Sequence, residues 1–206
     1  FWQEREGDGS TSSTRGQLRV DSLIAALQDG RSVVRCNAAT GIGVLGADGA
    51  SAARPLSTLL RDPLTKVRLS AAGALGKLGE GAVEVADALV GALADSDGPV
   101  SEAAAGSLAA LGDDALPALL AGLETDDEGH ARLILERIAV LPGAVDILFS
   151  ALESPALNVQ INAARGLGML GADKVGERIA LLESAQWIGD LRFRRAVRSA
   201  LKALRD

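Results

Sequence analysis

A thirteen-residue phrase recurs along the 206-residue chain and restricts it to a helical repeat fold. The phrase VRLSAAGALGKLG starts at Val67, and its first residue is called the anchor of the copy. Five other copies have the anchors Val34, Val100, His130, Val159 and Phe193, which makes successive anchors 33, 33, 30, 29 and 34 residues apart. Apolar or small residues recur at offsets 0, 4, 8 and 11 from the anchor, which is one face of an α-helix and does not fit the alternation of a strand. Each copy therefore predicts a helix.

A second amphipathic segment precedes every anchor. These segments read VDSLIAAL, ARPLSTLL, VADALVGAL, LPALLAGL, VDILFSAL and VGERIALL. In the first five, Leu stands seven and eleven residues before the anchor, as Leu60 and Leu56 do before Val67. Asp, Pro, Gly and Ser fill the short stretch between the two segments, as a tight turn between helices requires. The pattern predicts six consecutive helical hairpins.

The glycines fit this pattern better than they fit a cofactor loop. GIGVLG at residues 41–46 has the spacing of a dinucleotide-binding loop, but no strand pattern precedes it and Lys66 stands where the acidic ribose ligand belongs. The same spacing returns in GLGMLG at residues 166–171, so it belongs to the repeat. We expect the last glycine of a copy to end its helix with a positive φ at Gly46, Gly79, Gly112 and Gly171, with Pro142-Gly143 as the equivalent in the fourth copy. Glycines inside the helices, at positions 41, 43, 76, 166 and 168, predict close approach between helices.

The repeated phrase resembles a known family. Asp62 through Gly79 follows the pattern Asp-x-x-x-x-Val-Arg-x-x-Ala-Ala-x-x-Leu-Gly-x-Leu-Gly, which is similar to the HEAT-like repeat of the phycobilisome-lyase type. The resemblance covers about residues 18–206, with departures in the fourth and sixth copies. It implies an all-α fold, a right-handed α-solenoid (superhelix) of about six HEAT-like hairpins related to armadillo repeats, whose second helices line a concave surface.

The expected organisation is one repeat domain with an N-terminal extension. We expect residues 1–17 to form a flexible linker and residues 18–206 to form the repeats, at about 18–46, 47–79, 80–112, 113–142, 143–171 and 172–206. The chain starts with FW and a Gly/Ser/Thr stretch instead of Met, which predicts a fragment or a processed form. Two interpretations of this start stay open, a trimmed linker and the exit from a membrane anchor upstream of residue 1.

Composition and charge exclude several functional classes. A net charge of -6 and a pI near 4.9 argue against nucleic acid or an anionic membrane as the main partner. No apolar run is long enough to span a bilayer, and a single cysteine, Cys36, leaves no internal disulfide. We therefore expect a cytoplasmic protein. With only 2% aromatic residues, the surface is also poorly suited to a tetrapyrrole chromophore.

Catalytic and metal sites are not predicted. Deoxyhypusine hydroxylases, which resemble this family, hold iron with several His-Glu pairs, whereas this chain has one histidine, His130. Cys36 and His130 cannot supply the four ligands of a zinc site. The acidic run of Asp126, Asp127 and Glu128 lacks calcium-loop spacing and is interpreted as a solvated turn. We expect no enzyme activity and no cofactor.

The outward face of the second helices is the predicted partner site. Positions near offsets 2 and 6 combine apolar side chains with small ones, and arginines lie beside them. The candidate residues are Arg35, Cys36, Arg68, Leu69, Leu133, Ile161 and Arg165. Apolar residues flanked by small ones suit a shallow docking groove for a peptide or helix. The alternative is that Leu69, Leu133 and Ile161 only pack against neighbouring helices.

The last helix is unusually basic, and two interpretations of it stay open. Arg194, Arg195 and Arg198 form a possible patch for an acidic partner. The other interpretation is that the basic side chains give the last repeat a polar end, where cations also suit the C-terminus of a helix.

The function expected from these observations is a non-enzymatic adaptor or scaffold of bacterial type that binds a partner protein or peptide along the concave face. Two alternatives remain, a lyase-like accessory or regulatory subunit of an enzyme complex, and a spacer domain of a larger membrane-anchored protein.

Overall fold

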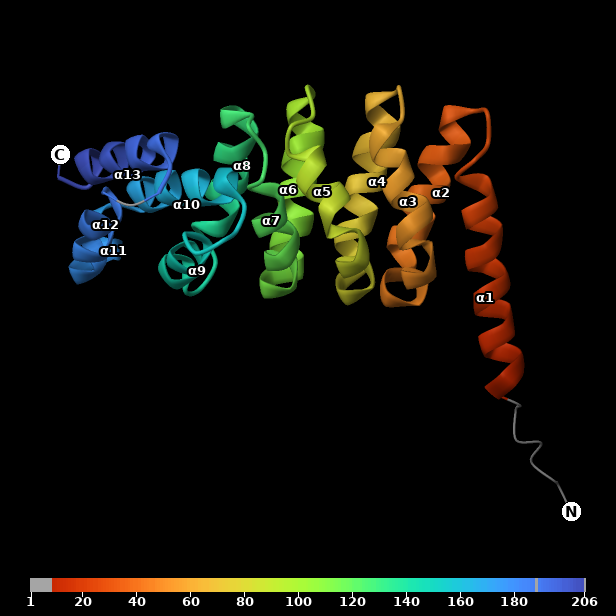
Figure 1. Ribbon diagram of the computed structural model, residues 1–206. Helices are drawn as coiled ribbons and strands as arrows, with labels where there is room; N and C mark the ends of the chain where they lie inside the picture. Colours follow the sequence, from red (N-terminus) through yellow and green to blue (C-terminus); the bar gives the residue numbers. More distant parts are fainter. Residues whose placement is uncertain (1–8, 188, 206) are drawn as a thin grey trace, which may run out of the picture. The chain divides into compact units, whose positions relative to one another are not determined.

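The computed structural model describes residues 9–187 and 189–205, and every regular element in these two ranges is helical (Figure 1). The helices that open each pair, called first helices, are α1 (Gly9–Ala26), α3 (Ala53–Thr58), α5 (Ala86–Ala92), α7 (Leu116–Gly122), α9 (Ala144–Ala151) and α12 (Ile179–Ala185). The second helices are α2 (Ser32–Leu45), α4 (Thr65–Lys77), α6 (Gly98–Leu111), α8 (Glu128–Ile138), α10 (Leu157–Leu170) and α13 (Leu191–Ala203). The predicted all-α repeat fold of the solenoid class is confirmed.

Short helical turns connect one pair to the next, and one more follows α3 inside the second pair. They are the 3-10 helices η1 (Gly46–Ala52), η2 (Leu59–Arg61), η3 (Gly79–Val85), η4 (Gly112–Ala115) and η5 (Gly176–Arg178), and the short helix α11 (Ala172–Val175). Three of them, η1, η3 and η4, begin at the glycine that closes a second helix. Gly46, Gly79, Gly112, Gly143 and Gly171 all have a positive φ, as predicted, which lets a residue without a Cβ close the helix at no steric cost.

The buried face of the second helices follows the repeated phrase. All six residues at offset 4 are buried, and so are all six at offset 8. They are Ala38, Ala71, Ala104, Ile134, Ala163 and Val197, and Ile42, Leu75, Leu108, Ile138, Leu167 and Leu201. Alanine at offset 4 in four of the six copies and long aliphatic residues at offset 8 in all six bring the helices close together and still fill the space between them.

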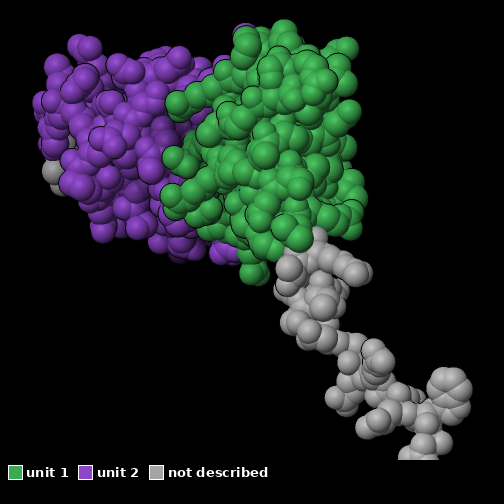
Figure 2. All heavy atoms as spheres, turned by 90° about the vertical axis from the view of Figure 1, so that its right-hand side faces the viewer, with its two compact units in different colours: residues 1–89, 97–111 green, residues 90–96, 112–206 purple. Residues whose placement is uncertain are grey.

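The chain divides into two compact units, which are coloured green and purple in Figure 2. Unit 1 contains residues 1–89 and 97–111, and unit 2 contains residues 90–96 and 112–206. Within unit 1, α4 packs against α2 on one side and α6 on the other. Within unit 2, α10 packs against α9 and α13. Neighbouring second helices therefore form the main internal packing of each unit.

Glycines at offset 9 let neighbouring second helices approach each other backbone to backbone. A Cβ added at Gly43 would lie 3.0 Å from Ala74 Cα, one at Gly76 would lie 3.0 Å from Ser107 Cα, and one at Gly168 would lie 2.9 Å from Ala200 Cα. Ala74, Ser107 and Ala200 all occupy offset 7 of the next second helix of the same unit. The close approach predicted from the interior glycines is thus a repeated backbone contact between offsets 9 and 7.

The N-terminal boundary differs from the prediction. Residues 1–17 were expected to be a linker, but α1 begins at Gly9, so residues 9–17 are helical. The Ser- and Thr-rich composition misled the prediction because these residues cost a helix only about 0.5 kcal/mol each, which a packed continuation offsets. Within α1, Gln17 donates to Asp21 one turn later. The remainder of the expected linker, residues 1–8, lies outside the described residues.

Candidate partner-binding site

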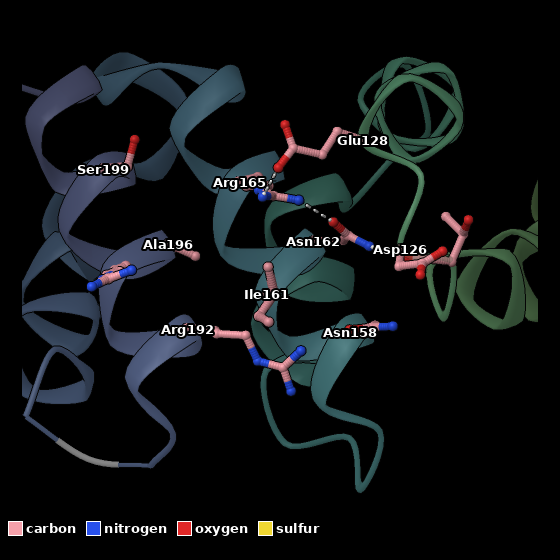
Figure 3. A pocket seen from close by; sticks show the side chains of 11 residues that line it. Asp126, Glu128, Asn158, Ile161, Asn162, Arg165, Arg192, Ala196 and Ser199 are labelled. Carbon is pink, nitrogen blue, oxygen red and sulfur yellow. Dashed lines mark hydrogen bonds and ion pairs between the residues drawn. The ribbon is translucent and has the colours of Figure 1, made fainter.

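An open groove of about 380 Å³ lies in unit 2 between α10, α13 and the turn that joins α7 to α8 (Figure 3). Its lining residues come from three segments. The turn and the start of α8 supply Thr125, Asp126 and Glu128, α10 supplies Asn158, Ile161, Asn162 and Arg165, and α13 supplies Arg192, Arg195, Ala196 and Ser199. Four of these, Ile161, Arg165, Arg195 and Ser199, stand at offsets 2 and 6 of their copies, the positions predicted to face outward. The packing of α10 against α13 brings these positions together.

The floor of the groove is apolar. Ile161 is 8% exposed and Ala196 is 7% exposed, and both lie between the two helices. Ile161 is therefore more buried than an outward-facing residue was expected to be, because α13 covers one side of it. The part that remains exposed gives the groove a small aliphatic surface.

Two asparagines fix α10 to the turn that forms one wall. Asn162 Nδ2 donates to the carbonyl oxygens of Leu123 and Thr125 at 2.8 and 3.0 Å, and Asn162 is buried. Asn158 Nδ2 donates to the Glu124 carbonyl oxygen at 2.9 Å. These three bonds satisfy carbonyls at the end of α7 that the helix leaves without intrahelical partners. The wall is thus held by neutral side chains.

That wall carries the acidic side chains. Asp127 caps α8, since its Oδ1 accepts the His130 N–H at 2.9 Å. Glu128 Oε1 accepts a hydrogen bond from Arg165 Nη2 at 2.5 Å, and Arg165 Nη1 donates to Asn162 Oδ1 at 3.0 Å. Asp126 is exposed beside them. The acidic run predicted to be a solvated turn therefore contains a helix cap, one member of an ion pair and one exposed carboxylate.

The α13 wall carries the basic side chains. Arg195 is exposed and makes no hydrogen bond or ion pair with any residue that the structure describes. Arg192 Nε lies 3.5 Å from Asp190 Oδ1, and both side chains are largely exposed. The Asp190 oxygen accepts the shorter bond, 2.7 Å from the Arg192 N–H, which caps α13. An exposed pair at that distance contributes little, so both guanidinium groups remain available.

Of the predicted patch for an acidic partner, only Arg195 lines the groove. Arg194 is half-buried, and its Nε has no hydrogen-bond partner among the described residues. Arg198 is exposed on α13 but does not line the groove. The three arginines therefore do not all face the groove: Arg194 and Arg195 are consecutive and project in different directions from the helix, and Arg198 lies one turn beyond the lining residue Arg195.

Two arginines of the predicted partner site have structural roles instead. Arg35 Nη1 donates to the Asp29 carbonyl oxygen at 2.8 Å, and its Nε and Nη2 donate to the Asp62 carboxylate at 2.8 and 3.1 Å. Arg68 Nη1 donates to the Asp62 carbonyl oxygen at 3.0 Å. Each arginine follows its anchor and binds the carbonyl six residues earlier, which locks the turn of its own hairpin. In the fifth copy Gln160 makes the equivalent bond to the Ser154 carbonyl oxygen at 2.8 Å.

The Arg35–Asp62 pair is largely buried and affects titration. The side chains of Arg35 and Asp62 are 14% and 6% exposed. Burial raises the pKa of Asp62, but hydrogen bonds from Arg35 and from the Leu64 N–H lower it by more than burial raises it, so the pKa lies below the usual value of an aspartate. Hydrogen bonds from Arg31 likewise lower the pKa of Asp29. These carboxylates stay ionised well into acid.

The remaining predicted residues lie elsewhere. Cys36 lines an apolar depression of about 450 Å³ in unit 1 with five other residues, Ser32, Val33, Leu64, Thr65 and Lys66. Leu69 is 38% exposed on α4. Leu133 is half-buried and stands at offset 3, because Arg132 occupies offset 2 of the fourth copy. Neither Leu69 nor Leu133 lines the groove in unit 2.

Sequence reasoning missed several lining residues that a repeat-based signal could have found. Asn158 and Arg192 both stand directly before an anchor, at offset -1, and both line the groove. That offset lies next to offsets 2 and 6 on a helical surface. Inspecting it across the copies would have added both residues. The contribution of Asp126 and Glu128 had no such signal, because it depends on packing between residues more than 30 positions apart.

The groove offers charge and hydrogen bonds but lacks the usual nucleophile–base pair. Its lining residues, all within the described part of unit 2, include no histidine or cysteine. Within residues 9–187 and 189–205, no three His, Cys, Asp or Glu side chains are grouped to hold a metal ion. None of the helices described is long and apolar enough to cross a bilayer.

Comparisons with known families agree with the repeat. Residues 20–105 match the family model described as HEAT repeats, and residues 102–125 match the model described as PBS lyase HEAT-like repeat. No curated protein matches the chain significantly.

Solved structures with helical repeats are also similar. A TOG domain structure of crescerin, which uses a TOG domain array to regulate microtubules in the primary cilium, is 19% identical, with a TM-score of 0.60 and 89% of each chain covered. The complex of CpcE and CpcF of phycocyanin lyase from Nostoc sp. PCC7120 is 28% identical, with a TM-score of 0.46, over 98% of this chain and 80% of that one. A designed armadillo repeat protein for modular peptide recognition is 19% identical, with a TM-score of 0.44, over 89% and 99%. At these values the crescerin likeness supports the fold alone.

Proposed function

This chain belongs to the HEAT-like repeat family, and we propose that it is a non-enzymatic adaptor that binds a segment of a partner protein in the α10–α13 groove. One observation carries the proposal: Arg195 projects from a well-packed helix into an open groove and has no intramolecular partner among the described residues. A guanidinium group with a fixed base and free donors is a frequent centre of protein interfaces.

The surroundings of Arg195 support binding of a peptide segment. The groove has room for a few side chains, an aliphatic floor at Ile161 and polar groups on both walls. Asn162 and the Arg165–Glu128 pair hold the walls in place, so little ordering would be needed on binding. Pre-organised sites of this kind lose less entropy when a ligand binds.

The test is a selection of random twelve-residue peptides displayed on phage against the immobilised chain, followed by titration calorimetry with the selected peptides. We expect Arg195→Glu to weaken their binding at least roughly tenfold, because the new carboxylate repels what the guanidinium attracted. Arg198→Glu is the matched control, since Arg198 is exposed on the same helix but does not line the groove. It should change the affinity less than about twofold.

Circular dichroism melting of both variants shows whether the fold is retained. The adaptor proposal fails if no peptide is selected, or if Arg195→Glu and Arg198→Glu bind the selected peptides as tightly as the unmodified chain.

A further inference from the structure

We infer that the α10–α13 groove binds a dipolar peptide segment, with an acidic side chain against α13, a small aliphatic side chain on Ile161 and Ala196, and a basic side chain against the Thr125–Glu128 turn. This inference rests on the proposed function and specifies the chemistry of the partner segment. It is carried by the separation of charge across the groove.

The basic side of the groove is available to a carboxylate. Arg195 has no partner among the described residues, and Arg192 interacts with Asp190 only at 3.5 Å. Both point from one turn of α13, since they are three residues apart. Two arginine forks at this spacing can hold one carboxylate with charge-assisted hydrogen bonds.

The acidic side of the groove is available to a cation. Asp126 is exposed and lines the groove, and its carboxylate makes no hydrogen bond or ion pair within the described part of the chain. The Glu128 side chain is 76% exposed and shares its carboxylate with Arg165. A lysine or arginine on the ligand would find these two carboxylates together.

Arg165 lies between the basic side and the acidic side of the groove, and its guanidinium is less available to a ligand than those of Arg192 and Arg195. Its guanidinium is held by Glu128 and Asn162, so it neutralises the middle of the groove instead of adding to the basic wall (Figure 3). Ile161 lies between this pair and Arg192 in the same view. An aliphatic side chain is the group that fits there, because a charge placed on Ile161 would be desolvated without a partner.

The same arrangement argues against polyanions. A uniformly acidic peptide or a nucleic acid would gain at Arg192 and Arg195 but would be repelled by Asp126 and Glu128 on the opposite wall. Complementary charge of both signs is what discriminates between ligands here.

The experiment uses the whole chain and five fluorescein-labelled nine-residue peptides in a Gly/Ser background, followed by fluorescence anisotropy. The first peptide carries Asp, Ile and Lys in that order with one spacer residue between them, and the second carries them in reverse order. The third replaces Asp with Asn, the fourth replaces Lys with Gln, and the fifth replaces Lys with Asp. We expect one of the two orders to bind, and substitution of either charge in that order to weaken binding roughly tenfold each.

A charge reversal in the chain provides the matched control. The Arg192→Glu/Arg195→Glu variant should no longer bind the dipolar peptide but should bind a peptide in which Lys replaces Asp. The Arg198→Glu variant should bind the dipolar peptide as the unmodified chain does. Binding should also weaken as NaCl is raised from about 50 to 500 mM, since exposed charges are screened.

Two outcomes overturn the inference without touching the proposed function. In the first, phage-selected peptides bind in the groove but show no preference for opposite charges. In the second, the doubly acidic fifth peptide binds as tightly as the dipolar one. If neither the designed nor the selected peptides bind at all, the proposed function itself fails.

Discussion

The two units solve one structural problem with different chemistry. In unit 1 the turns are locked by guanidinium groups, since Arg35 and Arg68 donate to the carbonyls of Asp29 and Asp62 and Arg35 also pairs with the Asp62 carboxylate. In unit 2 the equivalent carbonyls accept from neutral amides, as Gln160 does with Ser154 and Asn162 does with Leu123 and Thr125. Among the described residues, arginines bind these turn carbonyls in unit 1 and amide side chains bind them in unit 2.

The two units also differ in whether the arginines near their surface depressions are already bonded within the chain. The depression in unit 1 is lined mainly by apolar groups such as Val33 and Leu64, and Arg35 beside it is committed to internal bonds. In unit 2 Arg192 and Arg195 stand at offsets -1 and 2, away from the turn-binding offset 1, and both line the groove. An arginine is a candidate for ligand binding only when its guanidinium group is not already hydrogen-bonded to acceptors within the chain.

The largest test of the comparison is Asp62→Ala in unit 1. It leaves the largely buried Arg35 without its carboxylate and removes the acceptor of the Leu64 N–H, so we expect unfolding to become easier by about 3 kcal/mol. Urea denaturation measures the change. Asp62→Asn is the matched variant, which keeps an acceptor for Leu64 and should lose less. Equal stability of the unmodified chain, Asp62→Ala and Asp62→Asn would show that the Arg35–Asp62 ion pair contributes nothing to stability.

The lock in unit 1 should also depend on pH. Because the pKa of Asp62 is lowered in the folded state, its stabilising contribution is complete above the pKa of the unfolded chain, about 3.9, and is lost as the pH falls through the folded value. The difference in unfolding free energy between the unmodified chain and Asp62→Asn should therefore narrow below about pH 4. A difference that stays constant down to pH 2 would contradict the assigned role of ionised Asp62.

The corresponding change in unit 2 is Asn162→Ala. It leaves the carbonyls of Leu123 and Thr125 without a donor and creates a small cavity, so we expect a loss of about 2 kcal/mol. Asn158→Ala, which removes one bond at a less buried position, should cost about 1 kcal/mol or less. Thermal melts at pH 5.5 and pH 8 should show the same loss, because the donor and acceptors of these bonds do not titrate and the Glu128 carboxylate, which pairs with the Arg165 bound to Asn162, is ionised at both pH values. A loss that varies with pH would break the distinction between the units.

Helix spacing should respond alike in both units. Gly76→Ala and Gly168→Ala each place a Cβ 3.0 Å or less from a backbone Cα of the next helix, and overpacking should outweigh the gain in helix propensity by about 1 kcal/mol. Gly73→Ala is the control on the same helix as Gly76, since its Cβ would meet nothing within 4 Å, and it should stabilise by about 0.5 kcal/mol. Melting temperatures that shift in the same direction for Gly73→Ala and Gly76→Ala would show that the contact is not tight.

The smallest expected effect comes from replacing the glutamine that binds a turn carbonyl in unit 2 with the arginine that does so in unit 1. Gln160→Arg gives unit 2 the device of unit 1, and arginine can reach the same Ser154 carbonyl, so the unfolding free energy should change by less than about 0.5 kcal/mol. Gln160→Ala removes the bond and should cost more. If Gln160→Arg destabilises the chain as much as Gln160→Ala, arginine and glutamine are not interchangeable at this position. The difference between the two units then needs another explanation.

Periodicity predicted the fold and part of the site. Offsets 4 and 8 gave the buried face in all six copies, because positions on one helix follow from its geometry alone. Of the candidate residues, Ile161 and Arg165 were chosen from the outward offsets and Arg195 from the basic last helix, and all three line the groove. Roles that depend on a distant partner did not follow. The sequence did not reveal that Arg35 is ion-paired, because its carboxylate partner lies 27 residues away. Arg165 is likewise paired with Glu128, which lies 37 residues away.

The glycine contacts also determine what length of ligand could use more than one repeat. Where a glycine at offset 9 meets a small residue at offset 7, backbone atoms set the separation of the two neighbouring second helices. No long side chain lies between these helices to change that separation. The interval between successive copies is therefore a fixed length from α2 through α4 to α6 in unit 1 and from α10 to α13 in unit 2. A peptide that contacts two successive copies must match that length with its own residue spacing, so inserting or deleting one residue between its contact points should abolish the second contact.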